Sequence, residues 1–136
     1  MEKKLLLIAI LLFVYITSTQ AQDLSGKWRW NSDNGQVVYS LTLNHISKDR
    51  VTGVHCIQNF KIKITECSTP EEEYTVILVK ITENIFKGSI LSGTGKEREM
   101  RDIQIQYLPL EDRIIFSLTT VPEEPFLIPV EAILQR

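Results

Sequence analysis

Residues 37–44 read V-V-Y-S-L-T-L-N, with apolar side chains at 37, 39, 41 and 43 and polar ones at 40, 42 and 44. A period of two is typical of a β-strand with one buried face, because successive side chains point to opposite faces of a sheet. These eight residues therefore predict a strand, whose buried face carries Tyr39, Leu41 and Leu43.

Similar apolar segments recur along the chain from Trp28 onward, and short polar or Pro/Gly-containing turns separate them. They cover residues 51–57, 60–64, 74–81, 85–91, 103–107, 114–118 and 126–134. No connection is long enough to hold a crossover helix, so neighbouring strands are expected to pair antiparallel. The predicted fold is all-β: a single antiparallel meander of about eight strands that closes into a barrel. A two-sheet β-sandwich is the alternative.

The first 21 residues have the layout of a secretory signal peptide. Lys3 and Lys4 precede an apolar run over residues 5–16, and Thr19-Gln20-Ala21 ends in a small residue suited to cleavage. The run is too short to cross a bilayer. We therefore expect a signal peptide over residues 1–21 and one β-barrel domain over residues 22–136. The mature chain is then secreted or periplasmic and has no membrane span.

The charge balance is slightly acidic, with 15 Lys and Arg against 17 Asp and Glu and a net charge of −2. Removal of residues 1–21 changes this balance little. Nucleic-acid and anionic-membrane surfaces usually need a basic patch, so the composition argues against both.

Cys56 and Cys67 are the two cysteines, and an exported chain meets an oxidising compartment. An intramolecular disulfide is therefore expected. A metal site is the alternative, because His55 adjoins Cys56, but two thiols and one histidine do not make a tetrahedral set, and no second histidine lies at ligand spacing. We expect neither metal nor cofactor.

The spacing of this cysteine pair conflicts with the predicted strand over residues 60–64. The midpoint between the cysteines falls between Lys61 and Ile62, inside that strand. Either a turn lies near residues 60–63 and the following strand is short, or the disulfide bridge is diagonal.

Leu24-Ser25-Gly26-Lys27-Trp28 resembles the opening strand of the lipocalin and avidin group of calycin-like β-barrels. This resemblance implies that Trp28 closes one end of the barrel and that Arg136 covers its indole by a cation–π contact. The chain also resembles small exported Bacteroidetes proteins with this opening, a cysteine pair and an apolar last strand. Biotin binding is not expected, since no tryptophan follows Trp30.

Trp30 and Tyr39 are the expected ligand-binding residues. Trp30 lies two positions from Trp28 and so shares its face, and Tyr39 lies on the predicted buried face. They would line an apolar pocket for a small apolar ligand. The alternative is that the same side chains simply fill the core.

A protein partner is the second functional hypothesis. Acidic loops around Glu72 and Glu124 would suit an inhibitor or immunity protein that enters a basic cleft in the periplasm. No catalytic motif is present, and His45 is expected to be a buried, hydrogen-bonded side chain rather than a general base. We therefore expect no catalytic residues and no enzymatic activity.

Overall fold

The computed structural model describes residues 3, 23–93, 98–121 and 126–136. The expected signal peptide, apart from Lys3, and the turn that contains Glu124 lie outside these residues. The described part contains nine strands. They are β1 (Gly26–Asn31), β2 (Val37–His45), β3 (Arg50–Asn59), β4 (Ile64–Cys67), β5 (Val76–Thr82), β6 (Ile85–Ser92), β7 (Glu99–Leu108), β8 (Arg113–Leu118) and β9 (Glu131–Gln135).

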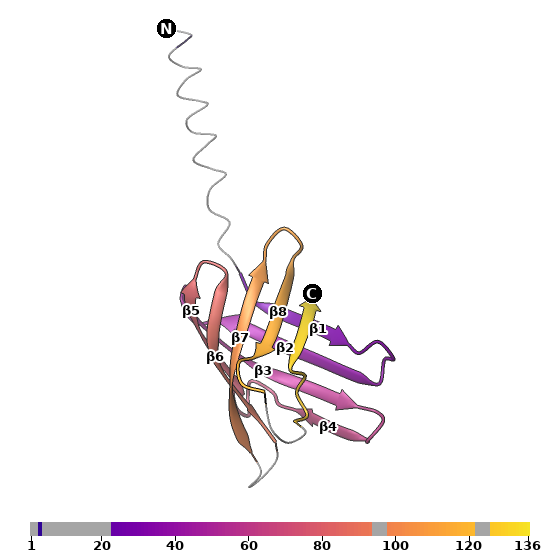
Figure 1. Cartoon of the computed structure of the whole chain (residues 1–136). Coiled ribbons are helices and arrows are strands. Elements are labelled where there is room, and N and C mark those ends of the chain that lie inside the picture. The colour runs from indigo at the N-terminus through magenta and orange to yellow at the C-terminus, as the bar shows by residue number, and fades with distance from the viewer. Residues whose placement is uncertain (1–2, 4–22, 94–97, 122–125) are drawn as a thin grey trace.

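Eight of these strands form a closed antiparallel meander barrel, as Figure 1 shows. Each strand pairs with the next, except that β3 pairs with β5 through its first half and with β4 through its second half. Arg29 lies opposite Gln135, and this pairing joins β1 to β9 and closes the barrel. The predicted all-β barrel is confirmed, with β4 as one additional strand.

Two glycines let neighbouring strands approach closely within the sheet. A Cβ atom on Gly53 would collide with the carbonyl oxygen of Thr42, and one on Gly88 would collide with that of Ile77. Such contacts are impossible for any other residue, so these positions fit the sharp bending that a small barrel needs.

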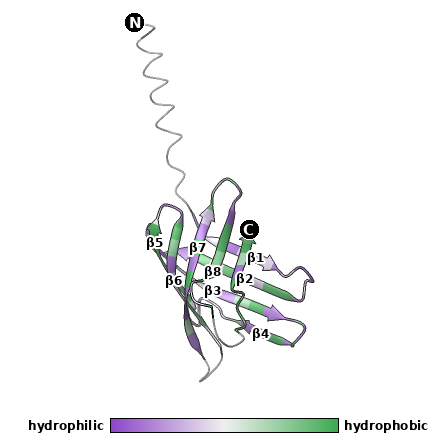
Figure 2. Ribbon diagram, in the orientation of Figure 1, coloured by the Kyte–Doolittle hydropathy of each residue, from purple (hydrophilic) through white to green (hydrophobic). Residues whose placement is uncertain are grey.

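The buried apolar residues form one core inside the barrel. Figure 2 shows hydrophobic and hydrophilic residues alternating along the strands. Aromatic rings meet across this interior. Trp28 on β1 contacts Tyr107 on β7 with ring centroids 6.1 Å apart, and Tyr39 on β2 contacts Phe116 on β8 at 5.3 Å. At these levels the barrel is packed with side chains.

The prediction of a strand over residues 60–64 is wrong for every residue except Ile64. Residues 60–63 form the turn between β3 and β4, and only Ile64 belongs to a strand. Cys56 lies directly opposite Cys67 across β3 and β4, and the predicted disulfide between them is confirmed. The turn alternative is therefore the correct one, and the bridge is not diagonal.

The last predicted strand is shorter than its apolar pattern indicated. β9 begins at Glu131, while Phe126 and Leu127 are half-buried and pack against the core from a non-strand segment. Among the described residues, no helix has the length and apolar character needed to cross a membrane.

Candidate functional site

Trp28 and Arg136 lie together at the end of the barrel that contains the C-terminus. Trp28 is buried and donates its indole N–H to the carbonyl oxygen of Leu24 at 2.8 Å. The Arg136 guanidinium carbon lies 4.3 Å from the centre of the indole ring. Arg136 also donates to the carbonyl oxygen of Asp23 and forms an ion pair with Asp112 at 3.0 Å. These contacts stabilise the fold at this end of the barrel.

Trp30 and Tyr39 face each other directly across β1 and β2. Tyr39 in turn lies opposite Ile57 on β3, which lies opposite Glu66 on β4. Direct cross-strand neighbours share a face. Trp30, Tyr39, Ile57 and Glu66 thus form one row across four strands, which we call the inner row. The two sequence-predicted ligand residues are brought together in it.

The Tyr39 side chain is fully buried, yet its hydroxyl has no hydrogen-bond partner among the described residues. Burial is the main factor that raises the pKa of this phenol well above its ordinary value, and the charge of Glu66 adds to the effect. The hydroxyl is therefore protonated at neutral pH and available as a donor. A buried hydroxyl without a partner costs about 1–3 kcal/mol.

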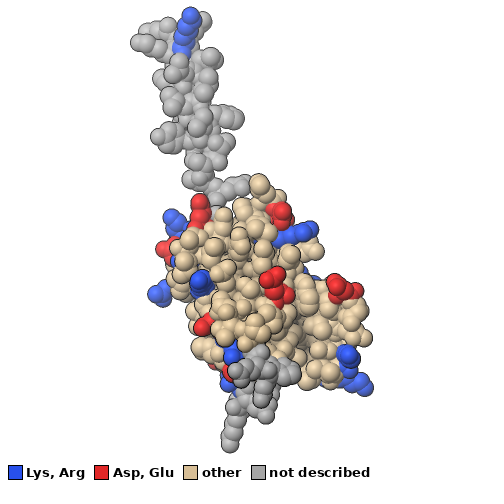
Figure 3. Space-filling model, in the orientation of Figure 1, with Lys and Arg blue, Asp and Glu red and all other residues tan. Residues whose placement is uncertain are grey.

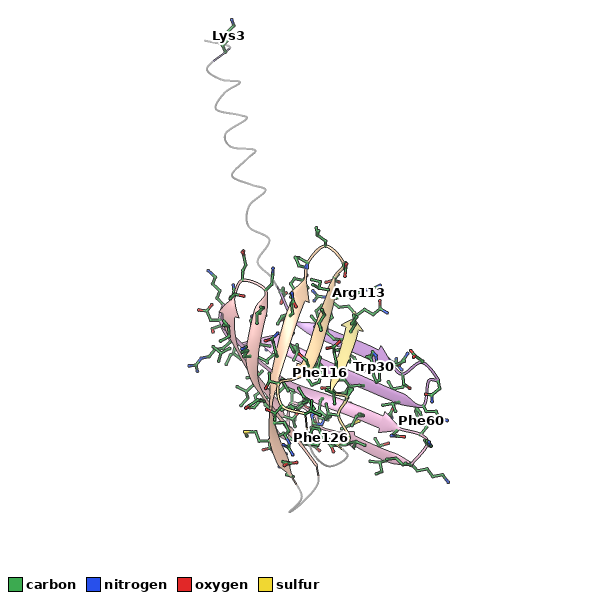
Figure 4. The ribbon with its side chains drawn as sticks, viewed as in Figure 1. Lys3, Trp30, Phe60, Arg113, Phe116 and Phe126 are labelled. Carbon is green, nitrogen blue, oxygen red and sulfur yellow. A yellow bond between two sulfur atoms is a disulfide. The ribbon has the colours of Figure 1, made fainter. Side chains whose placement is uncertain are left out.

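Trp30 is only half-buried and packs against the edge of the core, as do Phe126 and Leu127. Figure 4 labels Trp30, Phe116 and Phe126 and shows the last of these well away from the C-terminal end of β9. Of these four aromatic residues, Trp30 and Phe126 are partly exposed, whereas Tyr39 and Phe116 are buried against each other.

Arg101 belongs to the same interior. It lies directly opposite buried Ile90 on β6 and therefore shares its inward face. Its guanidinium lies 5.6 Å from the centre of the Phe126 ring and pairs with Glu99 at 2.6 Å. Its Nε atom is buried without a partner among the described residues. Arg101 and Tyr39 thus each present an unused donor.

A polar cluster of four side chains links β4 to β6. It consists of His55, Glu66, Thr75 and Ser92. Glu66 accepts hydrogen bonds from His55 Nε2, from the Ser92 hydroxyl at 2.7 Å and from the backbone N–H of Gly93 at 3.0 Å. Thr75 Oγ1 lies 2.8 Å from His55 Nδ1. The cluster satisfies both ring nitrogens and holds β4 against the barrel.

The Glu66 carboxylate is stabilised in its charged form. Burial by itself raises its pKa, but the hydrogen bonds from His55 and Ser92, the charge of His55 and the Gly93 N–H together outweigh burial. The pKa of Glu66 consequently lies below its usual value. The Ser92 hydroxyl donates to this carboxylate and not to His55.

The remaining sequence-predicted groups lie elsewhere. His45 is half-buried, and its Nε2 accepts a hydrogen bond from the backbone N–H of Leu24 at 3.0 Å. Glu72 is exposed and its carboxylate accepts from the N–H of Thr69 at 3.3 Å. Within the described ranges, no three His, Cys, Asp or Glu side chains gather as a metal site.

Sequence reasoning did not single out Glu66, Ser92, Arg101 or Phe126. Glu66 had one usable signal: once Cys56 is placed opposite Cys67, the neighbouring pair is Ile57 and Glu66. A charged residue opposite a buried isoleucine indicates a carboxylate that faces the interior.

Comparison of the chain with protein-family models, with curated proteins and with solved structures finds no match.

Proposed function

We propose that this chain is an exported, non-enzymatic binding protein that holds a small, mainly apolar ligand at the end of the barrel where Trp30 and Phe126 lie. The closed eight-stranded barrel and the buried Trp28 beneath Arg136 are compatible with a calycin-like barrel, and the small exported Bacteroidetes type is part of this proposal. The disulfide fits a secreted or periplasmic location.

The observation that carries this proposal is the buried, unpartnered hydroxyl of Tyr39, which is the direct cross-strand neighbour of the half-buried Trp30. A ligand with an apolar body would pack on Trp30, and a hydrogen-bond acceptor on it would meet the Tyr39 donor. The tight contact between Tyr39 and Phe116 limits the ligand to the end of the barrel rather than its middle. Small-molecule sites commonly combine such an apolar lining with a few polar groups.

Native mass spectrometry of the protein purified from its own exporting host tests this proposal. The expected result is a small organic molecule that remains bound and is lost in a Trp30→Ala variant. A bare chain, both as purified and after incubation with excess 1-decanol, would contradict it.

A protein partner is the second candidate function. It is favoured by the outer face of β5, where Ile77, Val79 and Ile81 form an exposed apolar row. Inhibitor or immunity proteins use such surfaces, often beside charged loops that steer association. Co-purification of a protein that is lost on Val79→Ser and on Glu72→Lys, while decanol binding is absent, would favour this function.

A further inference from the structure

The turn between β3 and β4, together with the first residue of β4, presents three exposed apolar side chains within five residues. Phe60 is 59% exposed, Ile62 52% and Ile64 45%. We call residues 60–64 the hairpin tip. Figure 4 shows Phe60 at the outer end of this hairpin, away from the barrel. Single exposed apolar residues are ordinary, but a contiguous group at a projecting point marks an interaction site.

The hairpin tip is held in place by bonds that fix its shape. The Asn59 side-chain oxygen accepts hydrogen bonds from the backbone N–H groups of Lys61 and Ile62, at 3.1 and 3.3 Å. Phe60 donates its N–H to the carbonyl oxygen of Gln36 at 2.8 Å. The disulfide links β3 to β4 below the tip. A rigid tip has little conformational entropy to lose when it docks.

Two lysines alternate with the apolar residues of the hairpin tip. Lys61 and Lys63 are exposed, and neither forms an ion pair with another described residue. Figure 3 shows positive charge at the lower right of the molecule, where this hairpin lies in Figure 1. The chain as a whole is acidic, so this basic and apolar tip is a local exception to its composition.

We propose that the hairpin tip docks on an anionic lipid bilayer, with Phe60 and Ile62 entering the interface and Lys61 and Lys63 contacting the headgroups. The lysine charges complement the anionic headgroups, and the apolar side chains complement the acyl-chain region beneath them. A stable protein interface uses about 20–30 residues on each side, far more than this five-residue tip offers. A bilayer needs only a few apolar side chains and positive charges. This docking does not depend on the proposed ligand.

Vesicle flotation of the full chain tests the proposal. Mass spectrometry first identifies the N-terminal residue of the purified chain. The vesicles contain equal parts of phosphatidylcholine and phosphatidylglycerol, or phosphatidylcholine alone. The anionic vesicles are expected to bind the chain more tightly, by about fivefold for each lysine, and salt should weaken this binding. Lys61→Gln with Lys63→Gln should remove the preference, and Phe60→Ser with Ile62→Ser should abolish flotation.

Leu110→Ser is the matched control, because Leu110 is fully exposed in the turn between β7 and β8. It should leave flotation unchanged, and urea unfolding should show that all variants fold equally well. An uncleaved N-terminal segment would be common to every variant and so could not produce these differences. The proposal is overturned if the chain floats with neither vesicle. It is also overturned if Leu110→Ser weakens binding as much as the tip variants, or if a chain that does not float binds a protein through Phe60.

Discussion

Glu66 on β4 and Ser92 on β6 are joined by a hydrogen bond of 2.7 Å, although, among the described strands, β4 pairs in the sheet only with β3. With the His55 contact, this bond fastens the additional strand to the barrel. The inner row therefore ends at the Glu66 carboxylate, which accepts hydrogen bonds from His55 on β3 and from Ser92 on β6. Separate predictions follow from the stability that Glu66 provides, from the unpartnered Tyr39 hydroxyl and from the accessible Trp30.

Glu66→Gln is expected to destabilise the fold at neutral pH by about 1–3 kcal/mol, because the amide N–H₂ would then face a donor from His55 or Gly93. The folded-state pKa of Glu66 lies below the reference value of 4.5. The stability from its charged form is therefore complete above about pH 4.5 and is lost as the pH falls through the folded pKa. Urea unfolding at neutral pH and at about pH 3 should show the two proteins converging in acid. Glu71→Gln, at an exposed position in the next loop, serves as the control.

Tyr39→Phe is expected to stabilise the fold by about 1 kcal/mol, since it removes a buried hydroxyl that has no described partner. Tyr74→Phe should leave the free energy of unfolding unchanged, because Tyr74 is exposed. Loss of stability in Tyr39→Phe would mean that the hydroxyl has a partner in solution.

The Cys56–Cys67 disulfide should protect both thiols in the native, oxidised chain from iodoacetamide. Its removal by Cys56→Ser with Cys67→Ser is expected to cost about 2–3 kcal/mol, because the bridge closes a short loop in the unfolded chain. Alkylation of both cysteines without reductant would refute the bridge.

Trp28→Ala is expected to cost roughly 3–5 kcal/mol, as a large-to-small change in the core. Trp30→Ala should cost clearly less, because Trp30 is only half-buried. Thermal and urea unfolding of the two variants measure this difference. A loss below about 1 kcal/mol for Trp28→Ala would show that the indole does not pack as a core residue.

The barrel was predictable because its strands are half-buried and so carry the period-two pattern. Tyr39, Leu41 and Leu43 indicated the correct inner face of β2. The same pattern misled at residues 60–64. There the hydrogen bonds to the Asn59 side chain and the register set by Cys56 and Cys67 determine a turn. In a turn, alternating apolar residues do not mark a buried face.

The polar cluster was beyond sequence reasoning for a different reason. Ser92 and Glu66 are 26 residues apart. They come together because β3 pairs with both β4 and β5, and β5 pairs with β6. Arg101 likewise lies in a charged segment that reads as solvated, yet its register opposite Ile90 turns it inward. Such pairings depend on strand register, which the apolar pattern alone does not fix over long separations.

Titration of the folded chain with N-phenyl-1-naphthylamine tests whether the barrel binds a small apolar ligand at Trp30. We expect saturable binding, quenching of tryptophan emission and a higher Tm, with about 2.7 kcal/mol of added stability at a hundredfold excess over Kd. Trp30→Ala should weaken this binding more than it weakens folding, and Ile133→Ser, on the exposed face of β9, should change neither. No binding to the folded chain and an unchanged Tm would contradict a ligand site at Trp30. If Glu72→Lys and Glu124→Lys then abolished capture of a partner protein, the inhibitor function would replace it.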